Sequence, residues 1–216
     1  MTERRGYRLQ RRAERQEETR RRIIAATAAL HEEVGPAQTT ISAIAARAGV
    51  ERLTVYRHFP DERGLLQACQ ELHLSAHPLP DIAAWASIAD PSTRLRTALA
   101  ELYSHYRATE AMTAHVLRDA PTIPVLAELL QEMPRYFAAA QEVLGEGWAR
   151  TDVHSSLFTA ALGHALDFET WRSLVRRQGL DDGEAVALMV RLISGLATTD
   201  IFGDDGAPAP NERNRQ

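Results

Sequence analysis

The sequence predicts an all-α protein. Apolar residues recur at spacings of three and four along most of the 216-residue chain, which is the period of one face of a helix. No stretch combines apolar–polar alternation with β-branched enrichment, the pattern of a half-buried strand. Apolar residues make up 44% of the chain, which suffices for a packed core. No window reaches the ~18 consecutive apolar residues of a membrane span.

Four helices are expected in the N-terminal third. Gly35 and Pro36 stop the first helix. Thr40 is placed to cap the second, and Gly49 closes it with a left-handed residue. A proline ends the third, and Asp61 caps the fourth. The expected bounds are 14–33, 41–48, 51–58 and 62–75.

Five more helices are expected after a proline-rich junction at residues 76–92. Thr151 is a candidate cap for the first of the two long C-terminal helices, and Gly179 follows its end. Asp181 and Glu184 have the spacing of a capping box at the start of the last helix. The expected bounds are 92–108, 110–118, 122–144 with a break near Pro134, 151–178 and 181–199.

Charge is distributed unevenly along the chain. The formal net charge is −4, yet residues 1–63 hold 13 Arg against 9 Asp and Glu, while residues 64–216 hold 12 Arg against 20. The basic excess is concentrated in residues 1–22, with 9 Arg and 4 Glu. A basic arm on an acidic body fits an N-terminal part that meets DNA phosphates. Such an arm would reach phosphates or the minor groove, as homeodomain arms do. The alternative is a solvated or disordered charge run.

Compartment and covalent chemistry are constrained by composition. The first 22 residues carry charge where a secretory signal needs an apolar stretch. The single cysteine, Cys69, excludes an internal disulfide and a cysteine-based zinc site. A cytoplasmic location is therefore expected.

The second and third helices predict a helix-turn-helix, since both are short and a glycine lies in the turn between them. Their apolar faces form a small core with the first helix, built from Leu30, Ile44, Ala45, Ala48, Val50, Val55 and Phe59. The third helix leaves Arg52, Thr54, Arg57 and His58 exposed, with Tyr56 at the edge. The major groove of B-DNA admits one helix, and arginine can donate to guanine O6 and N7 there. Tyrosine and histidine suit phosphates.

Residues 40–66, TISAIAARAGVERLTVYRHFPDERGLL, resemble the DNA-binding signature of the tetracycline-repressor (TetR) family, T-x-x-x-I-A-x-x-A-G-V-x-x-x-x-x-Y-x-H-F-x-x-K-x-x-L. The resemblance covers about residues 20–70. It implies that Thr40 touches a phosphate and that Arg63, standing where the family usually has lysine, contacts another. The DNA-binding residues that it implies are Thr40, Ser42, Arg52, Leu53, Thr54, Tyr56, Arg57, His58 and Arg63.

Two positions depart from the signature. Glu51 replaces the usual small hydroxyl residue that caps the recognition helix, and Leu53 replaces a frequent glycine or proline. These departures support a competing hypothesis, a helical small-molecule-binding or scaffolding protein whose corner at 40–66 no longer binds DNA. A compact corner in an unrelated all-helical protein is a further alternative.

The resemblance also implies the organisation of the chain. It gives a helix-turn-helix DNA-binding domain at 19–76, which follows the basic arm that the charge distribution indicates at residues 1–18. A larger helical ligand-binding and dimerisation domain follows at 77–202, and by composition residues 203–216 form a disordered tail.

Two sets of body residues follow from this expectation. The expected dimer interface pairs apolar stripes of the last two helices with those of a second copy, and its residues are Val153, Leu157, Ala161, Leu162, Ala165, Phe168, Val186, Met189, Val190 and Ile193. The expected ligand-binding residues are Trp85, Leu102, Tyr103, Tyr106, Met112, His115, Met133, Phe137 and Phe158. Packing inside one subunit is the alternative for both sets.

No enzyme is predicted. The chain has no nucleophile elbow and no phosphate-cradling glycine loop. His73 and His77 have metal-ligand spacing, but no third ligand is evident, so no metal and no cofactor is expected. The expected protein is a cytoplasmic homodimeric repressor. Its expected partners are a palindromic operator in double-stranded DNA and a largely apolar small-molecule effector. No interaction with a membrane is expected.

Overall fold

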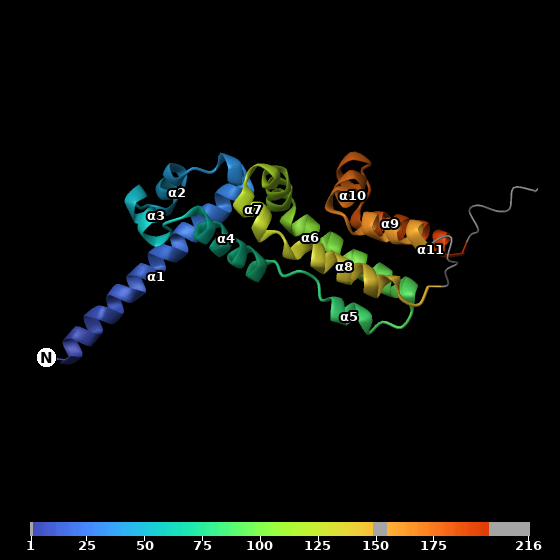
Figure 1. Ribbon diagram of the computed structural model, residues 1–216, viewed down its shortest axis with the longest axis horizontal. Helices are drawn as coiled ribbons and strands as arrows, with labels where there is room; N and C mark the ends of the chain where they lie inside the picture. Colours follow the sequence, from blue (N-terminus) through green and yellow to red (C-terminus); the bar gives the residue numbers. More distant parts are fainter. Residues whose placement is uncertain (1, 149–154, 199–216) are drawn as a thin grey trace, which may run out of the picture. The chain divides into compact units, whose positions relative to one another are not determined.

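The computed structural model describes residues 2–148 and 155–198, and no strand occurs among them. The all-α prediction is therefore confirmed (Figure 1). The helices are α1 (Thr2–Glu33), α2 (Ile41–Ala48), α3 (Arg52–His58), α4 (Glu62–Ala76), α5 (Ile82–Ala86), α6 (Pro91–Asp119), α7 (Pro124–Leu129), α8 (Glu132–Gly145), α9 (Ser155–Leu166), α10 (Phe168–Arg172) and α11 (Asp182–Thr198). Short turns of helix follow at η1 (Pro36–Gln38), η2 (Ala120–Thr122) and η4 (Ser173–Arg177). No helix within the described ranges is long and apolar enough to cross a membrane.

The chain divides into two compact units. Unit 1 comprises Met1–Asp81 and Glu101–Ala139, and unit 2 comprises Ile82–Ala100 and Ala140–Gln216. Residues 101–139 therefore pack in the same unit as the N-terminal helices. The functional boundary expected at residue 77 stays a prediction.

Unit 1 contains the helix-turn-helix, and its apolar core holds the expected residues except Val50, which is only partly buried against it. The shared core of α1 to α4 consists of Ile23, Ala26, Leu30, Ile44, Ala45, Ala48, Val55, Phe59, Leu65 and Ala68. Thr40 caps α2 by accepting the N–H of Ala43 at 3.1 Å, and Asp61 caps α4 by accepting that of Gly64 at 2.8 Å. Gly49 has φ +65°, a left-handed conformation that glycine adopts without a steric penalty.

Unit 2 is held together by large aromatic side chains and one buried arginine. Trp85 and Trp171 are fully buried, and the indole N–H of Trp171 donates to Asp182 at 2.9 Å. Arg94 is only 5% exposed. Its guanidinium donates to the backbone carbonyls of Ile88, Val143 and Glu146 at 2.9, 2.8 and 3.0 Å. These bonds satisfy a charged group that would otherwise be costly to bury.

The first helix is longer than expected from sequence. It starts at Thr2 rather than near residue 14. The added segment, residues 2–13, holds five arginines and no proline, and arginine is a good helix former, so the helix continues in spite of Gly6. Helices 92–108 and 110–118 are also one element, α6, because the Thr109 hydroxyl bonds back to the carbonyl of His105 at 2.9 Å instead of capping a new helix.

Two helix breaks lie at other positions than expected. The break near Pro134 falls instead at residues 130–131, and Pro134 lies in the first turn of α8, where a missing N–H costs little. The expected helix 151–178 is interrupted at Asp167, whose backbone is extended. Its carboxylate accepts the N–H groups of Glu169 and Thr170 at 2.8 and 3.2 Å and so starts α10.

At the last helix the capping box is confirmed. Asp181 accepts the N–H of Glu184 at 2.8 Å, and Glu184 accepts the N–H of Asp181 at 2.9 Å. The expected cap Thr151 and the expected tail at 203–216 lie outside the described residues.

Candidate nucleic-acid interface

Helix α3 is amphipathic and presents one solvent-facing side. Val55 is fully buried and Phe59 is 5% exposed, so both anchor α3 to the core of unit 1. On the other side Arg52 and Arg57 are exposed. Leu53 is 77% exposed and Tyr56 45% exposed. An exposed leucine beside two arginines and a tyrosine can contact a thymine methyl while the charged groups meet bases and phosphates.

The remaining predicted residues of α3 are less accessible. Thr54 and His58 are half-buried at the edges of the exposed side. Glu51 is the N-cap residue of α3, and its side chain makes no capping bond. Its carbonyl accepts the N–H of Thr54 at 2.8 Å. The N-terminus of α3 therefore lacks the side-chain cap that a hydroxyl residue would supply at this position.

His58 lies in a positively charged neighbourhood. Partial burial, followed by the charges of Arg57 and Arg20, lowers the pKa of His58, whereas Glu17 acts in the opposite direction. The guanidinium of Arg20 lies 4.7 Å from the centre of the Phe59 ring, a cation–π contact between α1 and the end of α3. Arg20 was not predicted for this surface, because only the tertiary fold brings it to Phe59.

Helix α2 contributes its N-terminus to the same region. Thr40 and Ser42 are exposed, and the Thr40 oxygen that accepts the Ala43 N–H still has a hydroxyl proton to donate to a phosphate. Arg47 forms two hydrogen bonds to the carboxylate of Glu33 at 2.5 and 2.6 Å. This bidentate pair fixes α2 against α1 and lowers the pKa of Glu33.

Arg63, at the start of α4, is engaged by another part of unit 1. Its guanidinium forms an ion pair with Glu128 of α7, and both side chains are half exposed. That hydrogen bond raises the pKa of Arg63. Beside it, the Gln70 amide donates to the carbonyl of Leu129 at 3.1 Å. The group expected to meet a phosphate is therefore held by a carboxylate in this structure.

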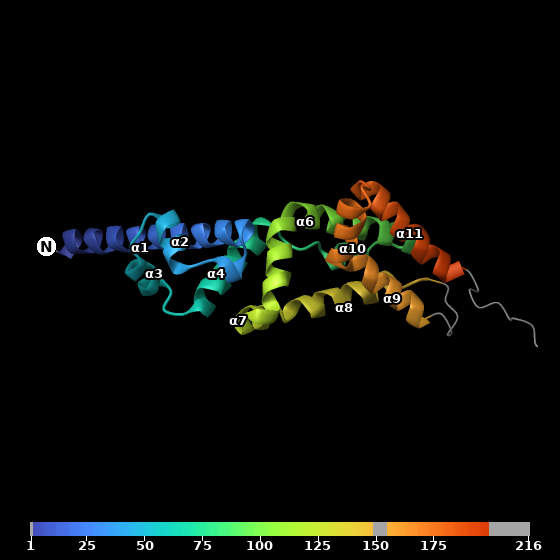
Figure 2. The ribbon, with the colours of Figure 1, turned by 90° about the horizontal axis from the view of Figure 1, so that it is seen from above.

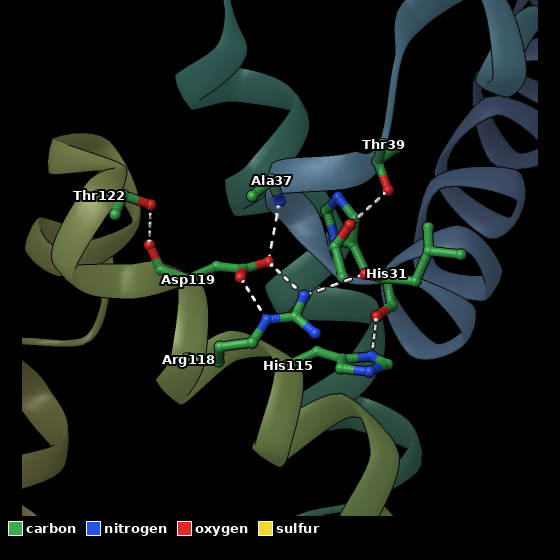
Figure 3. A network of polar contacts seen from close by, with 9 residues as sticks. His31, Ala37, Thr39, His115, Arg118, Asp119 and Thr122 are labelled. Atoms are coloured by element: carbon green, nitrogen blue, oxygen red, sulfur yellow. Dashed lines mark hydrogen bonds and ion pairs between the residues drawn. The ribbon is translucent and has the colours of Figure 1, made fainter.

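A polar network joins the C-terminal end of α6 to the end of α1 and to η1 (Figure 3). Arg118 donates to the carbonyl of Val34 at 3.0 Å and to the Asp119 carboxylate at 2.7 and 3.0 Å. The Asp119 carboxylate also accepts the N–H of Ala37 at 2.9 Å. The Arg118 hydrogen bond lowers the pKa of Asp119. Two adjacent residues of α6 thus bond the backbone on both sides of the Gly35 turn.

Two histidines complete this network. His115 Nδ1 lies 3.1 Å from the carbonyl oxygen of His31, so Nδ1 is the protonated nitrogen and donates the bond. The His31 ring is buried, with Nδ1 3.5 Å from Cys69 Sγ. Burial lowers the pKa of His31 to about 4 and raises the pKa of Cys69 to about 11. Both groups are neutral at pH 7. Sequence reasoning missed this network because its members lie about 80 residues apart in the chain.

The predicted ligand-binding residues are distributed over both units. In unit 1, Leu102, Tyr103, Tyr106 and Met112 of α6 are buried. Met133 and Phe137 are half-buried on α8, and His115 bonds to the end of α1. In unit 2, Trp85 and Phe158 are fully buried. A common pocket for these residues stays a prediction.

The predicted interface residues lie in unit 2, and most of them face its interior. The buried ones are Leu162, Ala165, Phe168, Val186, Met189, Val190 and Ile193. Ala161 is half-buried, and Val153 lies outside the described residues. The large apolar side chains that are exposed on α9 and α11 are Leu157, Leu188 and Leu192, at 41%, 37% and 53%. Of these three only Leu157 was predicted.

The histidine pair with metal-ligand spacing lies at the end of α4. The rings of His73 and His77 are 5.2 Å apart. Within residues 2–148 and 155–198 there is no group of three or more His, Cys, Asp or Glu side chains that could hold a metal ion.

Comparison with known proteins agrees with this geometry. Residues 23–69 match the family model described as "Bacterial regulatory proteins, tetR family". No curated protein matches the chain. Many neighbours among solved structures are TetR-family transcriptional regulators. A candidate TetR-family transcriptional regulator from Mesorhizobium loti MAFF303099 superposes with a TM-score of 0.60 at 18% identity, over 84% of this chain and 96% of that chain.

Two further structures have the same fold. A TetR-like transcriptional regulator from Rhodococcus sp. RHA1 has a TM-score of 0.56 at 17% identity, over 83% of this chain and 93% of that chain. A candidate transcriptional regulator from Saccharomonospora viridis, in complex with choline, has a TM-score of 0.56 at 19% identity, over 82% and 96%. The resemblance stated from the sequence is thereby confirmed. Residues 23–69 are therefore a segment of the kind found in the tetR family of bacterial regulatory proteins, and the chain has the fold of the transcriptional regulators named above.

Proposed function

We propose that this protein is a repressor that binds a palindromic operator as a homodimer and releases it when a small molecule binds. The observation that carries the proposal is the solvent-facing side of α3, where Arg52, Leu53, Tyr56 and Arg57 are all exposed. Two arginines within six residues of one short helix suit base edges and phosphates in a major groove. A cytoplasmic location, where the operator would be reached, is part of the proposal.

The homodimer is supported by the exposed apolar side chains of unit 2. Leu188 and Leu192 are one helical turn apart on α11, and α9, which carries Leu157, packs against α11. A two-fold related copy would cover these side chains with the same surface. Such a dimer would place two copies of α3 at half-sites about 34–36 Å apart, or a multiple of that, which requires a palindromic operator.

Release by an effector is supported by the double role of α6 within unit 1. Four buried residues predicted to bind ligand, Leu102 to Met112, lie on the same helix as Arg118 and Asp119. These last two bond the backbone next to the helix-turn-helix. A ligand that shifts α6 would therefore act on contacts that hold α1 and η1. A coupling of about 1–3 kcal/mol is typical of such linkage.

The proposed effector is largely apolar, with one polar or cationic group. Tyr103 and Tyr106 are buried on α6 with ring centres 6.4 Å apart, so an effector that entered beside this part of α6 would meet aromatic rings. Aromatic side chains also recognise quaternary ammonium groups. The choline complex of the Saccharomonospora viridis protein supports including small organic cations in an effector screen.

The test is fluorescence anisotropy of the purified protein on duplexes that tile the region upstream of its own gene, at two salt concentrations. We expect saturable, sequence-selective binding that weakens steeply with salt, as phosphate contacts require. Weak binding that is equal for every duplex would contradict the proposal and favour a helical small-molecule-binding or scaffolding protein. A compound that lowers the affinity for the selected duplex then identifies the effector class.

A further inference from the structure

The N-terminal half of α1 extends beyond the helix-turn-helix. Both ribbon views show α1 continuing past α2, α3 and α4 within unit 1 (Figure 1, Figure 2). Buried α1 residues begin at Ile23, whereas every side chain described over residues 10–18 is exposed. At 1.5 Å per residue, the segment from residue 2 to residue 19 is about 27 Å long.

The composition of residues 10–22 argues against a protein partner that buries an apolar face on this stretch of α1. Between residues 10 and 22 Ala13 is the sole apolar side chain, and it is exposed. The same stretch holds 6 Arg against 3 Glu. Nothing in it can form a hydrophobic interface, so charge must carry any interaction.

The charges are arranged on different sides of the helix. Arg11, Arg15 and Arg22 follow one another at i, i+4 and i+11, which places them within about 40° of one another at 3.6 residues per turn. Arg12 borders this face. Glu14 and Glu17 lie about 100° and 160° away from Arg15. Glu18, which is nearer, is paired with Arg21 at 2.7 Å. The ion pairs of the described residues do not include Arg12, Arg15 or Arg22.

The base of the extension adjoins the recognition helix. Arg20 lies over the ring of Phe59, the residue that ends α3. Since α1 is one unbroken helix, the arginine face is carried by the element that also supports the DNA-reading surface. A polyanion bound at α3 would therefore have neighbouring phosphates within reach of the extension.

We infer that Arg11, Arg12 and Arg15 form a second DNA-binding surface, which contacts the phosphates of the duplex flanking the sequence read by α3. Its length corresponds to about 8 base pairs at 3.4 Å per base pair. The contact adds affinity without reading sequence, since arginine bonds to phosphate carry no base information. This inference rests on the proposed DNA binding but makes a separate claim about where the duplex is held.

The test compares a short duplex that ends at the operator with one that carries 10 additional base pairs on each side. We expect the wild type to bind the longer duplex about tenfold more tightly at low salt. The triple variant Arg11→Gln, Arg12→Gln, Arg15→Gln should lose this advantage while it keeps the same operator preference. Its salt dependence on the longer duplex should weaken by about 0.9 in the logarithmic slope for each phosphate contact removed.

A matched pair of single variants separates the arginine face from net charge. Arg15→Gln and Arg21→Gln remove the same charge from exposed positions of the same helix, but Arg21 already pairs with Glu18. Only Arg15→Gln should reduce the preference for the longer duplex. Equal losses in both variants would overturn the inference. Circular dichroism and thermal unfolding should be unchanged, because all four side chains are exposed.

The remaining outcomes distinguish this inference from the proposed function. Selective binding with no preference for flanking DNA would overturn the inference and leave the regulator intact. The wild type could instead bind all sequences equally but bind longer duplexes more tightly, with the triple variant showing no such increase. That result would support the arginine face and contradict the operator proposal. A third outcome is that the wild type binds phosphatidylserine vesicles, the triple variant does not, and affinity for DNA is independent of duplex length. That outcome would overturn the inference and assign the arginine face to a membrane surface.

Discussion

Arg63 at the start of α4 forms an ion pair with Glu128 of α7, within unit 1. The arginine that the family resemblance assigns to a DNA phosphate is thus already bound to the carboxylate of Glu128. Both side chains are half exposed and solvent screens their attraction, so a phosphate can compete for the guanidinium.

Glu128→Gln should therefore increase affinity for the operator about two- to fivefold, because Arg63 no longer has to leave a carboxylate in order to bind a DNA phosphate. Equilibrium anisotropy at a fixed salt concentration measures this. Glu132→Gln is the control, since Glu132 is an exposed glutamate that pairs with Arg135 instead. An equal gain in both variants would indicate a general effect of net charge.

Arg52→Ala should cost about 1–3 kcal/mol in operator binding and relax the preference at one base pair, if Arg52 reads a base. Tyr56→Phe should weaken binding to all duplexes alike, because a phosphate contact is independent of sequence. Affinities for a set of operators with single base-pair changes separate the two. Unchanged specificity of Arg52→Ala would show that another residue reads that position.

Asp119 should be needed both for stability and for release by the effector. Its side chain is 6% exposed and accepts the N–H of Ala37 while it pairs with Arg118. Asp119→Ala should lower the free energy of unfolding by about 1–3 kcal/mol, because the Ala37 N–H and the Arg118 guanidinium lose the buried carboxylate that accepts from both. Asp119→Asn keeps an acceptor for Ala37 and should recover part of this loss. Chemical denaturation measures both variants, and equal losses would show that only the charge matters.

Stability should increase as the pH rises from about 4 to 6.5. Burial lowers the pKa of His31 to about 4 in the folded state, against about 6.5 in the unfolded chain. Between these values the unfolded chain binds a proton that folded His31 does not, so acid favours unfolding. The pKa difference between folded and unfolded His31 contributes about 3 kcal/mol to the free energy of unfolding, and this contribution is complete above pH 6.5.

His31→Gln removes this titration, and its unfolding free energy should vary less with pH over the same range. Some pH dependence should remain, since partial burial also lowers the pKa values of His73 and His105. Denaturant titrations at pH 4.5, 5.5 and 7 compare the two proteins. Parallel pH profiles would mean that His31 does not carry the effect.

Leu192→Asp should convert the proposed homodimer to a monomer, because it places a charge among the exposed apolar side chains of α9 and α11. Sedimentation equilibrium at micromolar concentration measures the mass. Leu72→Asp is the control, since Leu72 is exposed on α4 to a similar degree, 40%. A dimer that survives Leu192→Asp would place the interface elsewhere.

Local sequence signals determined the helix-turn-helix. Thr40, Gly49 and Asp61 end or begin their helices as expected, because each acts on backbone groups within three or four residues. The spacing of Val55 and Phe59 likewise identified the buried side of α3, and therefore its exposed side. The capping box at Asp181 and Glu184 is another such local signal.

The tertiary structure decided which groups meet across long separations. The end of α6 bonds the turn after α1, Arg63 pairs with Glu128, and Arg20 covers Phe59. It also decided that the stripe of α11 from Val186 to Ile193 is buried within unit 2 and leaves Leu188 and Leu192 exposed. Periodicity shows that a helix has an apolar face, but it does not show which surface buries that face. A neighbouring helix of the same chain and a second subunit can both supply apolar side chains to cover it.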